Sequence, residues 1–205
     1  MARSELIKVF SDCGGLLKGH FGLTSGRHSS IYLQCALVLQ YPDIARRIGI
    51  QLADLARETF VGAGQGDIDT VISPAVGGIV IGQEVAAGLG ARAIFSERVD
   101  GRMELRRGFK IGVGERLLAV EDVVTTGGSI RETVELALEC GGAVVGTASL
   151  VHRYTDKPVN PTNFPHLSLI PVHAPAYDPS DCPMCREGKP LEKPGSRHLS
   201  VPKVL

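Results

Sequence analysis

Residues 117–130 read LLAVEDVVTTGGSI, and this stretch decides the fold. The apolar run at its start predicts a buried strand, and the small residues after it predict a loop that opens a helix. Two adjacent carboxylates, Glu121 and Asp122, stand between the strand and the loop. Because ligands bind at the carboxyl ends of the strands in an open parallel sheet, the stretch predicts a ligand site at this strand end.

The loop at residues 125–129 has the composition of a phosphate site. It offers successive backbone N–H groups, side-chain hydroxyls and the positive end of a helix, which together suit a phosphate monoester. Gly127 and Gly128 allow a ligand to approach the backbone closely. Glu121 and Asp122 have the wrong sign for phosphate, so we expect them to face hydroxyl groups, a metal or developing positive charge. A sugar phosphate meets both requirements. An acidic pair that only caps the next helix is the alternative.

The middle of the chain alternates between helix and strand patterns. Apolar residues recur at helical spacing over residues 42–60, and two later helices end at glycines. The expected order is helix 42–60, strand 70–72, helix 79–89, strand 91–95, strand 117–120, helix 129–140 and strand 143–151. Strands joined by single helices form parallel sheets, so we predict an α/β fold with a mainly parallel central sheet flanked by helices.

Three segments lie outside this pattern. Residues 1–41 are expected to form an N-terminal hood, and residues 97–110 a long arginine-rich loop of the kind that is usually functional or disordered. Residues 156–205 are rich in proline and lack periodicity, which predicts an extended tail packed on the domain or on a partner subunit. We therefore expect one domain over residues 1–155, followed by this extension.

The composition excludes several classes of function. The 22 basic and 22 acidic residues cancel, so no net charge favours nucleic acid or a membrane surface. No segment approaches about 18 consecutive apolar residues, and the first ten residues mix charged with apolar side chains, unlike a secretion signal. The five cysteines are an odd number at irregular spacing, which indicates reduced thiols. We expect a cytoplasmic protein.

Other motifs are weaker. Neither a P-loop nor a complete Gly-x-Gly-x-x-Gly motif is present. Cys182 and Cys185 form half of a zinc knuckle, and a structural zinc ion would need His173 or a remote cysteine to complete it, so zinc is the less favoured interpretation. Packing or surface positions are expected for the other notable histidines, which are His20, His28 and His152.

The strand, the acidic pair and residues 125–129 resemble the phosphoribosyl pyrophosphate (PRPP) motif of the type I phosphoribosyltransferases. The resemblance extends to residues 21–32, to the turn at 73–78, to the arginine-rich segment and to residues 150–153. Over about residues 15–155 the chain is similar to the orotate phosphoribosyltransferases. Within the superfamily, the Leu-x-Ser-Gly-x-x-Ser stretch at residues 23–29 favours orotate over hypoxanthine or adenine as the base.

The resemblance implies a reaction. Orotate would react with PRPP in the presence of Mg²⁺, releasing pyrophosphate and forming orotidine 5′-monophosphate. Glu121 and Asp122 would stabilise the oxocarbenium character that develops at the anomeric carbon. Mg²⁺ would be carried mainly by oxygens of PRPP and by water, so no protein ligand is assigned to it.

The resemblance also implies binding roles and an assembly. Arg153 would pair with the orotate carboxylate, where a bidentate guanidinium fits better than a lysine. Arg98 and Arg102 would act in catalysis with the acidic pair, on a loop at 97–110 that closes over pyrophosphate and is shared across a homodimer. The pyrimidine would contact Thr125, Ser25, Gly26 and Tyr32. PRPP would contact Glu121, Asp122, Val123, Val124, Thr125, Thr126, Gly127, Gly128, Ser129, Arg98 and Gly77.

The chain departs from the better-known orotate enzymes in its basic residues. The turn at Val76 lacks a lysine, Thr24 replaces another, and the loop carries arginines instead of lysines and a histidine. We interpret the chain as a divergent subgroup whose loop arginines clamp pyrophosphate. A solvated charged face is the alternative for these arginines, which are Arg98, Arg102, Arg106 and Arg107. Two other functions stay open: a regulator that binds PRPP without catalysis, and a purine-base phosphoribosyltransferase.

Overall fold

The structure, a computed structural model, describes residues 1–23, 25–61, 66–158 and 160–194, so Thr24 and the end of the predicted tail lie outside it. Its main body is a six-stranded sheet in the order β5-β4-β3-β6-β7-β8. From β4 to β8 neighbouring strands run parallel, and β5 pairs antiparallel with β4. The mainly parallel sheet is confirmed. The strands are β3 (Thr70–Pro74), β4 (Arg92–Val99), β5 (Arg102–Leu105), β6 (Arg116–Val124), β7 (Ala143–Tyr154) and β8 (His166–His173).

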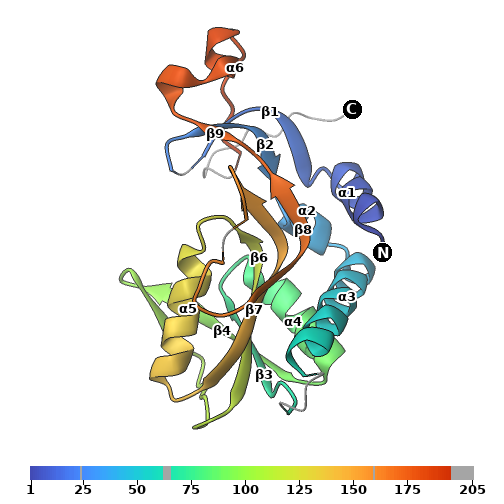
Figure 1. The fold of residues 1–205 in the computed structure, drawn as a ribbon, viewed down its shortest axis with the longest axis vertical. Coiled ribbons are helices and arrows are strands. Elements are labelled where there is room, and N and C mark those ends of the chain that lie inside the picture. The colour runs from blue at the N-terminus through green and yellow to red at the C-terminus, as the bar shows by residue number, and fades with distance from the viewer. Residues whose placement is uncertain (24, 62–65, 159, 195–205) are drawn as a thin grey trace.

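Helices cover both faces of this sheet (Figure 1). One face carries α3 (Pro42–Phe60) and α4 (Gly78–Leu89), and the other carries α5 (Gly128–Glu139). The helix predicted at 42–60 is confirmed to the residue, and α4 ends as predicted at Gly90, whose φ of 72° is the left-handed cap that glycine adopts most easily.

The central strand β6 is buried on both faces. Leu118 and Val120 belong to the core beneath α3 and α4, whereas Leu117 and Ala119 belong to the core beneath α5. All four side chains are fully buried. Burial on both faces explains why this strand is a continuous apolar run rather than an alternating one.

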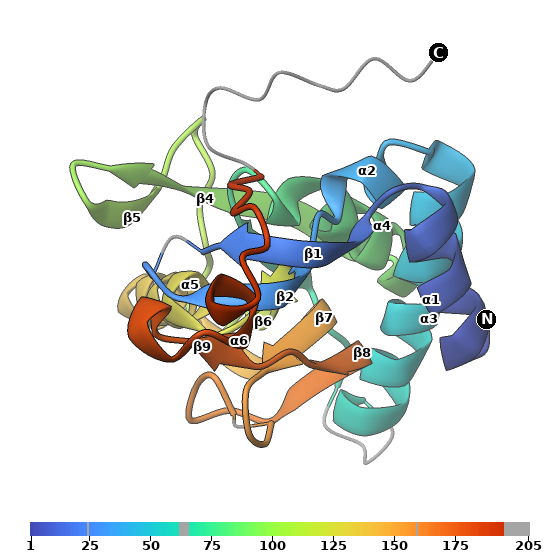
Figure 2. The same cartoon turned by 90° about the horizontal axis from the view of Figure 1, so that it is seen from above.

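A second, three-stranded sheet forms the hood at the end of the molecule where β6 and β7 finish (Figures 1 and 2). It has the order β1-β2-β9, and β1 and β2 pair antiparallel. Beside it lie α1 and α2, and after it come the short helices η1 and α6. These elements are α1 (Arg3–Asp12), β1 (Leu16–Gly22), β2 (His28–Leu33), α2 (Ala36–Leu39), β9 (Ala176–Tyr177), η1 (Pro179–Asp181) and α6 (Pro183–Arg186).

The C-terminal segment differs from the prediction. Residues 166–173 form β8, a parallel edge strand of the main sheet, and Ala176 pairs with Ser29 in the hood. The expectation of an extended tail from residue 156 is therefore wrong for this part of the chain. Pro171 obscured the strand in the sequence, but β8 is an edge strand, where a proline is tolerated because one side needs no ladder partner.

The arginine-rich segment also differs from the prediction of a loop. β4 continues to Val99 and turns back at Asp100 and Gly101 into β5. Both turn residues have positive φ, 47° and 86°, and Asp-Gly is the dipeptide that favours a two-residue hairpin turn. This signal was present in the sequence, and we refer to residues 97–110 below as the arginine hairpin.

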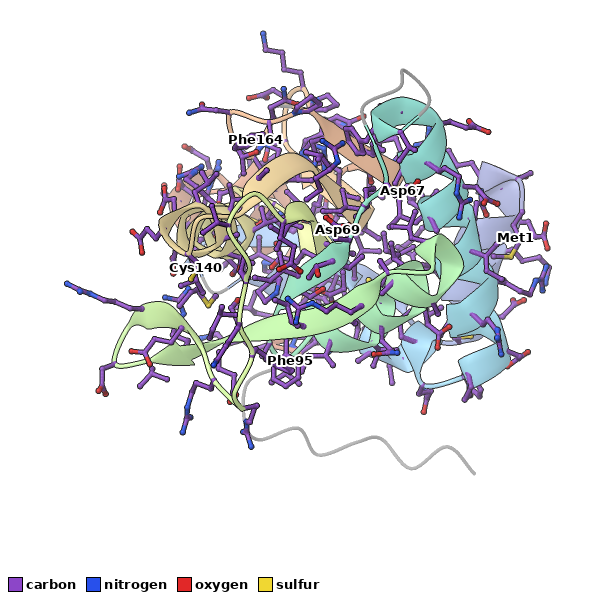
Figure 3. The ribbon with its side chains drawn as sticks, turned by 90° about the horizontal axis from the view of Figure 1, so that it is seen from below. Met1, Asp67, Asp69, Phe95, Cys140 and Phe164 are labelled. Atoms are coloured by element: carbon purple, nitrogen blue, oxygen red, sulfur yellow. The ribbon has the colours of Figure 1, made fainter. Side chains whose placement is uncertain are left out.

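The amino-terminal edge of the main sheet is closed by polar contacts. The backbone N–H of Arg116 donates to the Asp69 carboxylate at 2.9 Å, and its Nε donates to the Asp67 carbonyl at 2.9 Å. Figure 3 shows this end of the molecule, with Asp67 and Asp69 before β3. The carboxyl ends of the strands lie at the opposite end, beneath the hood (Figure 1). Within the described residues, no helix is both long and apolar enough to cross a membrane.

Candidate active site

Glu121 and Asp122 lie near the end of β6, and both are half-buried. Burial, together with the charge of Asp122, raises the pKa of Glu121 to about 8, although the Ser129 hydroxyl donates a hydrogen bond that favours the carboxylate. Burial also raises the pKa of Asp122, and the backbone N–H of Val123 opposes this shift. Two adjacent carboxylates with little access to water attract protons or a cation, so this acidic pair is suited to hold positive charge.

The loop after β6 presents backbone to open space. Thr125 and Thr126 are exposed, and a Cβ at Gly128, the first residue of α5, would meet nothing within 4 Å. Gly127 has a φ of 76°, and a Cβ there would lie 2.3 Å from Cβ of Pro161. The loop is therefore braced from behind by the segment that carries Pro161 and is open in front, at the N-terminus of a helix, where an anion is favoured.

The side chains of three residues predicted to contact PRPP, which are Val123, Val124 and Ser129, contact other parts of the protein instead. Val124 is fully buried in the core beneath α5, and Val123 packs against the core on the other face. The Ser129 hydroxyl bonds to Glu121. For the two valines, the backbone is the part that a ligand can reach.

The turn after β3 lies against the acidic pair. A Cβ at Gly77 would come within 2.8 Å of both carboxylate oxygens of Asp122, so this position has room for glycine alone. Gly77 precedes α4, and the Ala75–Val76 peptide before it is cis. Val76 itself is 82% exposed. The turn at Gly77, predicted to contact PRPP, therefore lies directly against Asp122 of the predicted acidic pair.

Arg153, near the end of β7, reaches the hood. Its Nη2 donates to the Ser29 hydroxyl at 3.0 Å, and its Nε is buried without a hydrogen-bond partner. Burial, and after it the charge of Arg27, lowers the pKa of Arg153. Among the residues that the structure describes, Arg153 makes no ion pair. A partly desolvated guanidinium with a free donor beside a second cation is a site for an anion.

Arg27 is a residue that the sequence analysis did not assign to the site. It lies within the Leu-x-Ser-Gly-x-x-Ser stretch, and that position was the available signal. Its Nη2 donates to the Ala176 carbonyl, and its Nε lies 3.6 Å from the Asp178 carboxylate. Segments distant in the sequence therefore hold Arg27 near Arg153.

The predicted pyrimidine contacts lie in the hood. Ser25 and Gly26 are exposed at the turn between β1 and β2, where Gly26 has a φ of 80° and donates its N–H to the Leu23 carbonyl at 2.9 Å. Tyr32 is half-buried on β2, with its ring centroid 5.8 Å from that of Phe21, and burial raises its pKa.

The arginine hairpin projects from the body of the molecule (Figures 1 and 2). Arg98 pairs with Glu132 of α5 at 2.7 Å, and Arg107 pairs with Glu97 at 2.8 Å, with Arg106 at 3.9 Å from the same carboxylate. In the described part of the chain, none of the four predicted clamp arginines makes an ion pair or hydrogen bond with the acidic pair.

Comparison with known proteins agrees with this arrangement. Residues 41–162 match the family model of the phosphoribosyl transferase domain. The orotate phosphoribosyltransferase of Pelotomaculum thermopropionicum is 48% identical over 202 residues, covering 97% of this chain and 100% of the relative. That of Chlorobium phaeobacteroides is 43% identical over 202 residues, covering 98% and 100%. The chain belongs to the orotate phosphoribosyltransferase family. The family resemblance predicted from the sequence is confirmed.

Solved structures of the phosphoribosyltransferase fold match this chain as well. The orotate phosphoribosyltransferase of Aeropyrum pernix aligns with a TM-score of 0.61 at 25% identity, covering 82% of this chain and 93% of that one. An orotate phosphoribosyltransferase from Mycobacterium tuberculosis, solved with inorganic phosphate, aligns with a TM-score of 0.59 at 22% identity, which shows the fold alone. The predicted type I fold is confirmed.

Proposed function

We propose that this orotate phosphoribosyltransferase family member transfers the 5-phosphoribosyl group from PRPP to orotate, forming orotidine 5′-monophosphate and pyrophosphate. One observation carries the proposal. An open glycine loop at a helix N-terminus, a half-buried acidic pair and the glycine turn at Gly77 meet at one sheet edge, with Arg153 free to bind an anion beneath the hood. The names of the full-length relatives supply the base.

Different residues of the chain bind the phosphate and stabilise the charge of the transition state. Backbone N–H groups of residues 125–129 bind the 5′-phosphate, because Gly128 leaves the approach open and the end of α5 favours an anion. Glu121 and Asp122 lie toward the ribose hydroxyls. As the bond to pyrophosphate lengthens, positive charge grows at the anomeric carbon, and the two carboxylates stabilise it in a site with little water.

The donor set of this site fits Mg²⁺. Carboxylate oxygens are the hard ligands that this ion prefers, and the crowded pair of Glu121 and Asp122 gains from a neutralising cation. We infer that Glu121 and Asp122 would hold the ion together with oxygens of PRPP. Bound there, Mg²⁺ would neutralise charge on the departing pyrophosphate.

Orotate is recognised by its carboxylate. Arg153 offers its unpaired Nε beside the Nη2 that already donates to Ser29, and a carboxylate can accept two parallel hydrogen bonds from such a guanidinium. Arg27 adds positive charge nearby. A purine base carries no carboxylate and gains nothing from this pair. Ser25, Gly26 and Tyr32 of the hood line the pyrimidine.

The arginine hairpin is proposed to close over pyrophosphate and to reach the second site of a homodimer in the cytoplasm. Its ion pairs do not oppose this movement strongly. The Arg98–Glu132 pair is 43% and 38% exposed, and surface pairs of this kind contribute about 0–1 kcal/mol. A pyrophosphate with several negative charges can therefore displace Glu132 from Arg98.

The test is pyrophosphate release from PRPP with orotate, adenine, hypoxanthine or no base. We expect release with orotate and at least about 10-fold less with either purine, because the carboxylate contact is worth about 1.5–3 kcal/mol. Turnover with a purine alone would reassign the base. Tight PRPP binding with no release for any base would instead support the PRPP-sensing regulator.

A further inference from the structure

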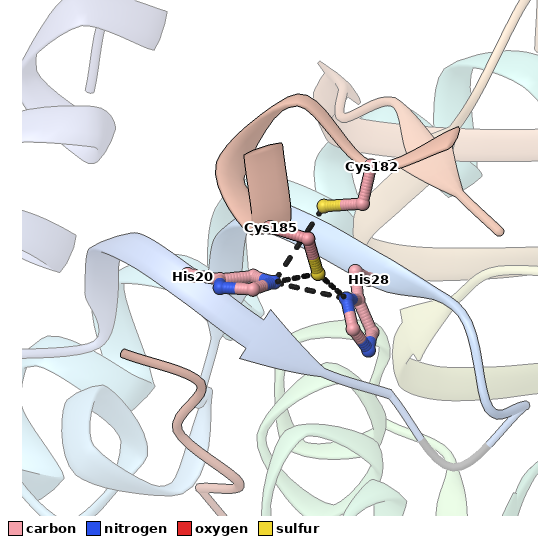
Figure 4. A group of neighbouring side chains, drawn as sticks. All are labelled: His20, His28, Cys182 and Cys185. Atoms are coloured by element: carbon pink, nitrogen blue, oxygen red, sulfur yellow. Dashed lines mark hydrogen bonds between the residues drawn. The ribbon is translucent and has the colours of Figure 1, made fainter. Parts of the chain in front are cut away.

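Four side chains from opposite ends of the chain converge at the outer side of the hood (Figure 4). His20 comes from β1 and His28 from the first position of β2, whereas Cys182 precedes α6 and Cys185 lies within it. One nitrogen or sulfur atom of each lies within 4.8 Å of the others. The two imidazoles and Cys182 are buried, and Cys185 is exposed. We call these four residues the thiol–imidazole cluster.

Hydrogen bonds alone do not satisfy this cluster. Nδ1 of His20 lies 2.9 Å from the Lys189 carbonyl, and since a carbonyl only accepts, this nitrogen carries the proton and Nε2 is left with a lone pair. Three groups contact that lone pair: Nδ1 of His28 at 2.9 Å, Sγ of Cys182 at 3.5 Å and Sγ of Cys185 at 3.6 Å. One lone pair accepts one good hydrogen bond, so hydrogen bonding does not account for three neighbours around this nitrogen.

Three of the separations match the edges of a tetrahedron around zinc. Zn–S bonds of about 2.3 Å and Zn–N bonds of about 2.0–2.1 Å place neighbouring ligand atoms roughly 3.3–3.8 Å apart. The two sulfur distances to His20 lie in that range, and Sγ of Cys185 is 3.3 Å from Nδ1 of His28. The His20–His28 separation of 2.9 Å needs to widen by a few tenths of an ångström.

We propose that His20, His28, Cys182 and Cys185 bind one structural Zn²⁺ ion. All four ligands come from the protein, which is the closed arrangement of a structural rather than a catalytic zinc site. The ion displaces one proton from each thiol, so two thiolates, two neutral imidazoles and Zn²⁺ form a neutral centre that can stay buried. The Lys189 carbonyl orients His20, as outer-shell acceptors do for metal-bound histidines.

The ion would fasten two parts of the hood. His20 and His28 stand on either side of the turn that carries Ser25 and Gly26, so the metal fixes both ends of this turn. Cys182 and Cys185 attach the C-terminal segment, which also runs beside β1 through hydrogen bonds from Gly22 N–H to Glu192 and from Glu192 N–H to His20. His173, the candidate partner from the sequence, packs against Tyr154 instead, and the histidines expected to be mere packing residues complete the set.

The experiment is elemental analysis of the full chain purified from zinc-supplemented medium, with the same preparation from cobalt-supplemented medium for spectroscopy. We expect about one zinc per chain, and for cobalt the visible bands of tetrahedral Co²⁺ with a thiolate charge-transfer band. Substituting Cys185→Ser or His28→Ala should reduce bound zinc at least about tenfold, whereas Cys140→Ser, a half-buried thiol at the end of α5, should leave it unchanged.

The outcomes separate the alternatives without requiring the variants to fold. Below about one-tenth of a metal per wild-type chain, with no tetrahedral cobalt spectrum, the proposal is overturned. A disulfide between Cys182 and Cys185 in that preparation would make the cluster a redox pair, and one iron or copper per chain would overturn the choice of zinc. If zinc is bound, a chelator strong enough to remove it should lower Tm by about 10 °C or more.

Discussion

The acidic pair at the end of β6 and the thiol–imidazole cluster of the hood both gather polar side chains, but they differ in sequence separation and in access to a ligand. The acidic pair consists of consecutive residues, and burial beside an open loop raises the pKa of both carboxyl groups. The cluster joins residues about 160 positions apart, and its ligand atoms face one another. An open site with strained carboxyl groups can bind and release a substrate. A closed set of four metal-binding side chains can hold an ion permanently.

We therefore expect the acidic pair to control turnover and the thiol–imidazole cluster to control folding stability. Substitutions at the acidic pair should change turnover while the fold persists, because burying these two carboxyl groups already costs stability. Substitutions in the cluster should change stability first.

Asp122→Asn is expected to have the largest effect on catalysis. Removing one charge from the pair that stabilises the oxocarbenium ion should lower kcat by about 10²–10³-fold, with little loss of folding stability. The measurement is orotate-dependent pyrophosphate release, together with a thermal melt. Asp43→Asn, an exposed acid in the first turn of α3, is the matched control. An unchanged kcat in Asp122→Asn would remove the acidic pair from the mechanism.

Arg153→Ala tests the anion site that lies between the two regions. Loss of a charge-assisted contact worth about 1.5–3 kcal/mol should raise KM for orotate by about 10–100-fold and KM for PRPP by much less. Arg46→Ala, at an exposed position of α3, should change neither constant. A larger rise in KM for PRPP than for orotate would assign the orotate carboxylate to another residue.

Gly127→Ala and Gly128→Ala form a pair within one loop. Alanine at Gly127 combines a positive φ with a contact at 2.3 Å to Pro161, so we expect the free energy of unfolding to fall by about 2–4 kcal/mol. Alanine at Gly128 meets open space, so stability should hold while PRPP binding weakens. Urea unfolding and PRPP titration measure the two effects. Equal PRPP affinity in Gly128→Ala and the wild type would contradict a ligand at this backbone.

Glu121→Gln should have the smallest effect, on the pH dependence of stability. Because the native pKa of about 8 lies above the ordinary value of 4.5, the folded chain retains a proton that the unfolded chain has released. Stability from this group is complete below pH 4.5 and is lost as pH rises through 8. We expect the wild type to lose about 2–3 kcal/mol between about pH 5.5 and 8.5 and Glu121→Gln to lose less.

The control for this comparison is Glu135→Gln, an exposed glutamate on α5. Urea midpoints at about pH 5.5 and 8.5, which fall within and just above this window, give the slope for each protein. If Glu121→Gln and the wild type have the same slope, Glu121 does not carry the buried proton.

The features that could be predicted from the sequence are those set by residues close together along the chain. The helix at 42–60 and the strand, acidic pair and loop at 117–130 follow local rules of periodicity, capping and glycine placement, and the structure has them. β8 was missed because its pairing depends on β7 and its proline looked disruptive. The Asp-Gly turn of the arginine hairpin was a local signal that the run of arginines obscured.

Long-range contacts explain the rest. Nothing near Cys182 in the sequence indicates that β1 and β2 bring His20 and His28 to it, because that proximity requires the hood, β9 and α6 to pack together. Arg27 and Arg153 likewise meet through tertiary structure. The ion pair of Arg98 with Glu132 depends on where α5 lies relative to the hairpin.

A crystal structure of the chain with PRPP and Mg²⁺ bound would test the roles of the acidic pair and of the loop after β6 together. We expect the 5′-phosphate on the backbone N–H groups of residues 125–129, with the ribose hydroxyls facing Glu121 and Asp122. A 5′-phosphate bound elsewhere, for instance on the arginine hairpin, with residues 125–129 making no contact to PRPP, would contradict this expectation.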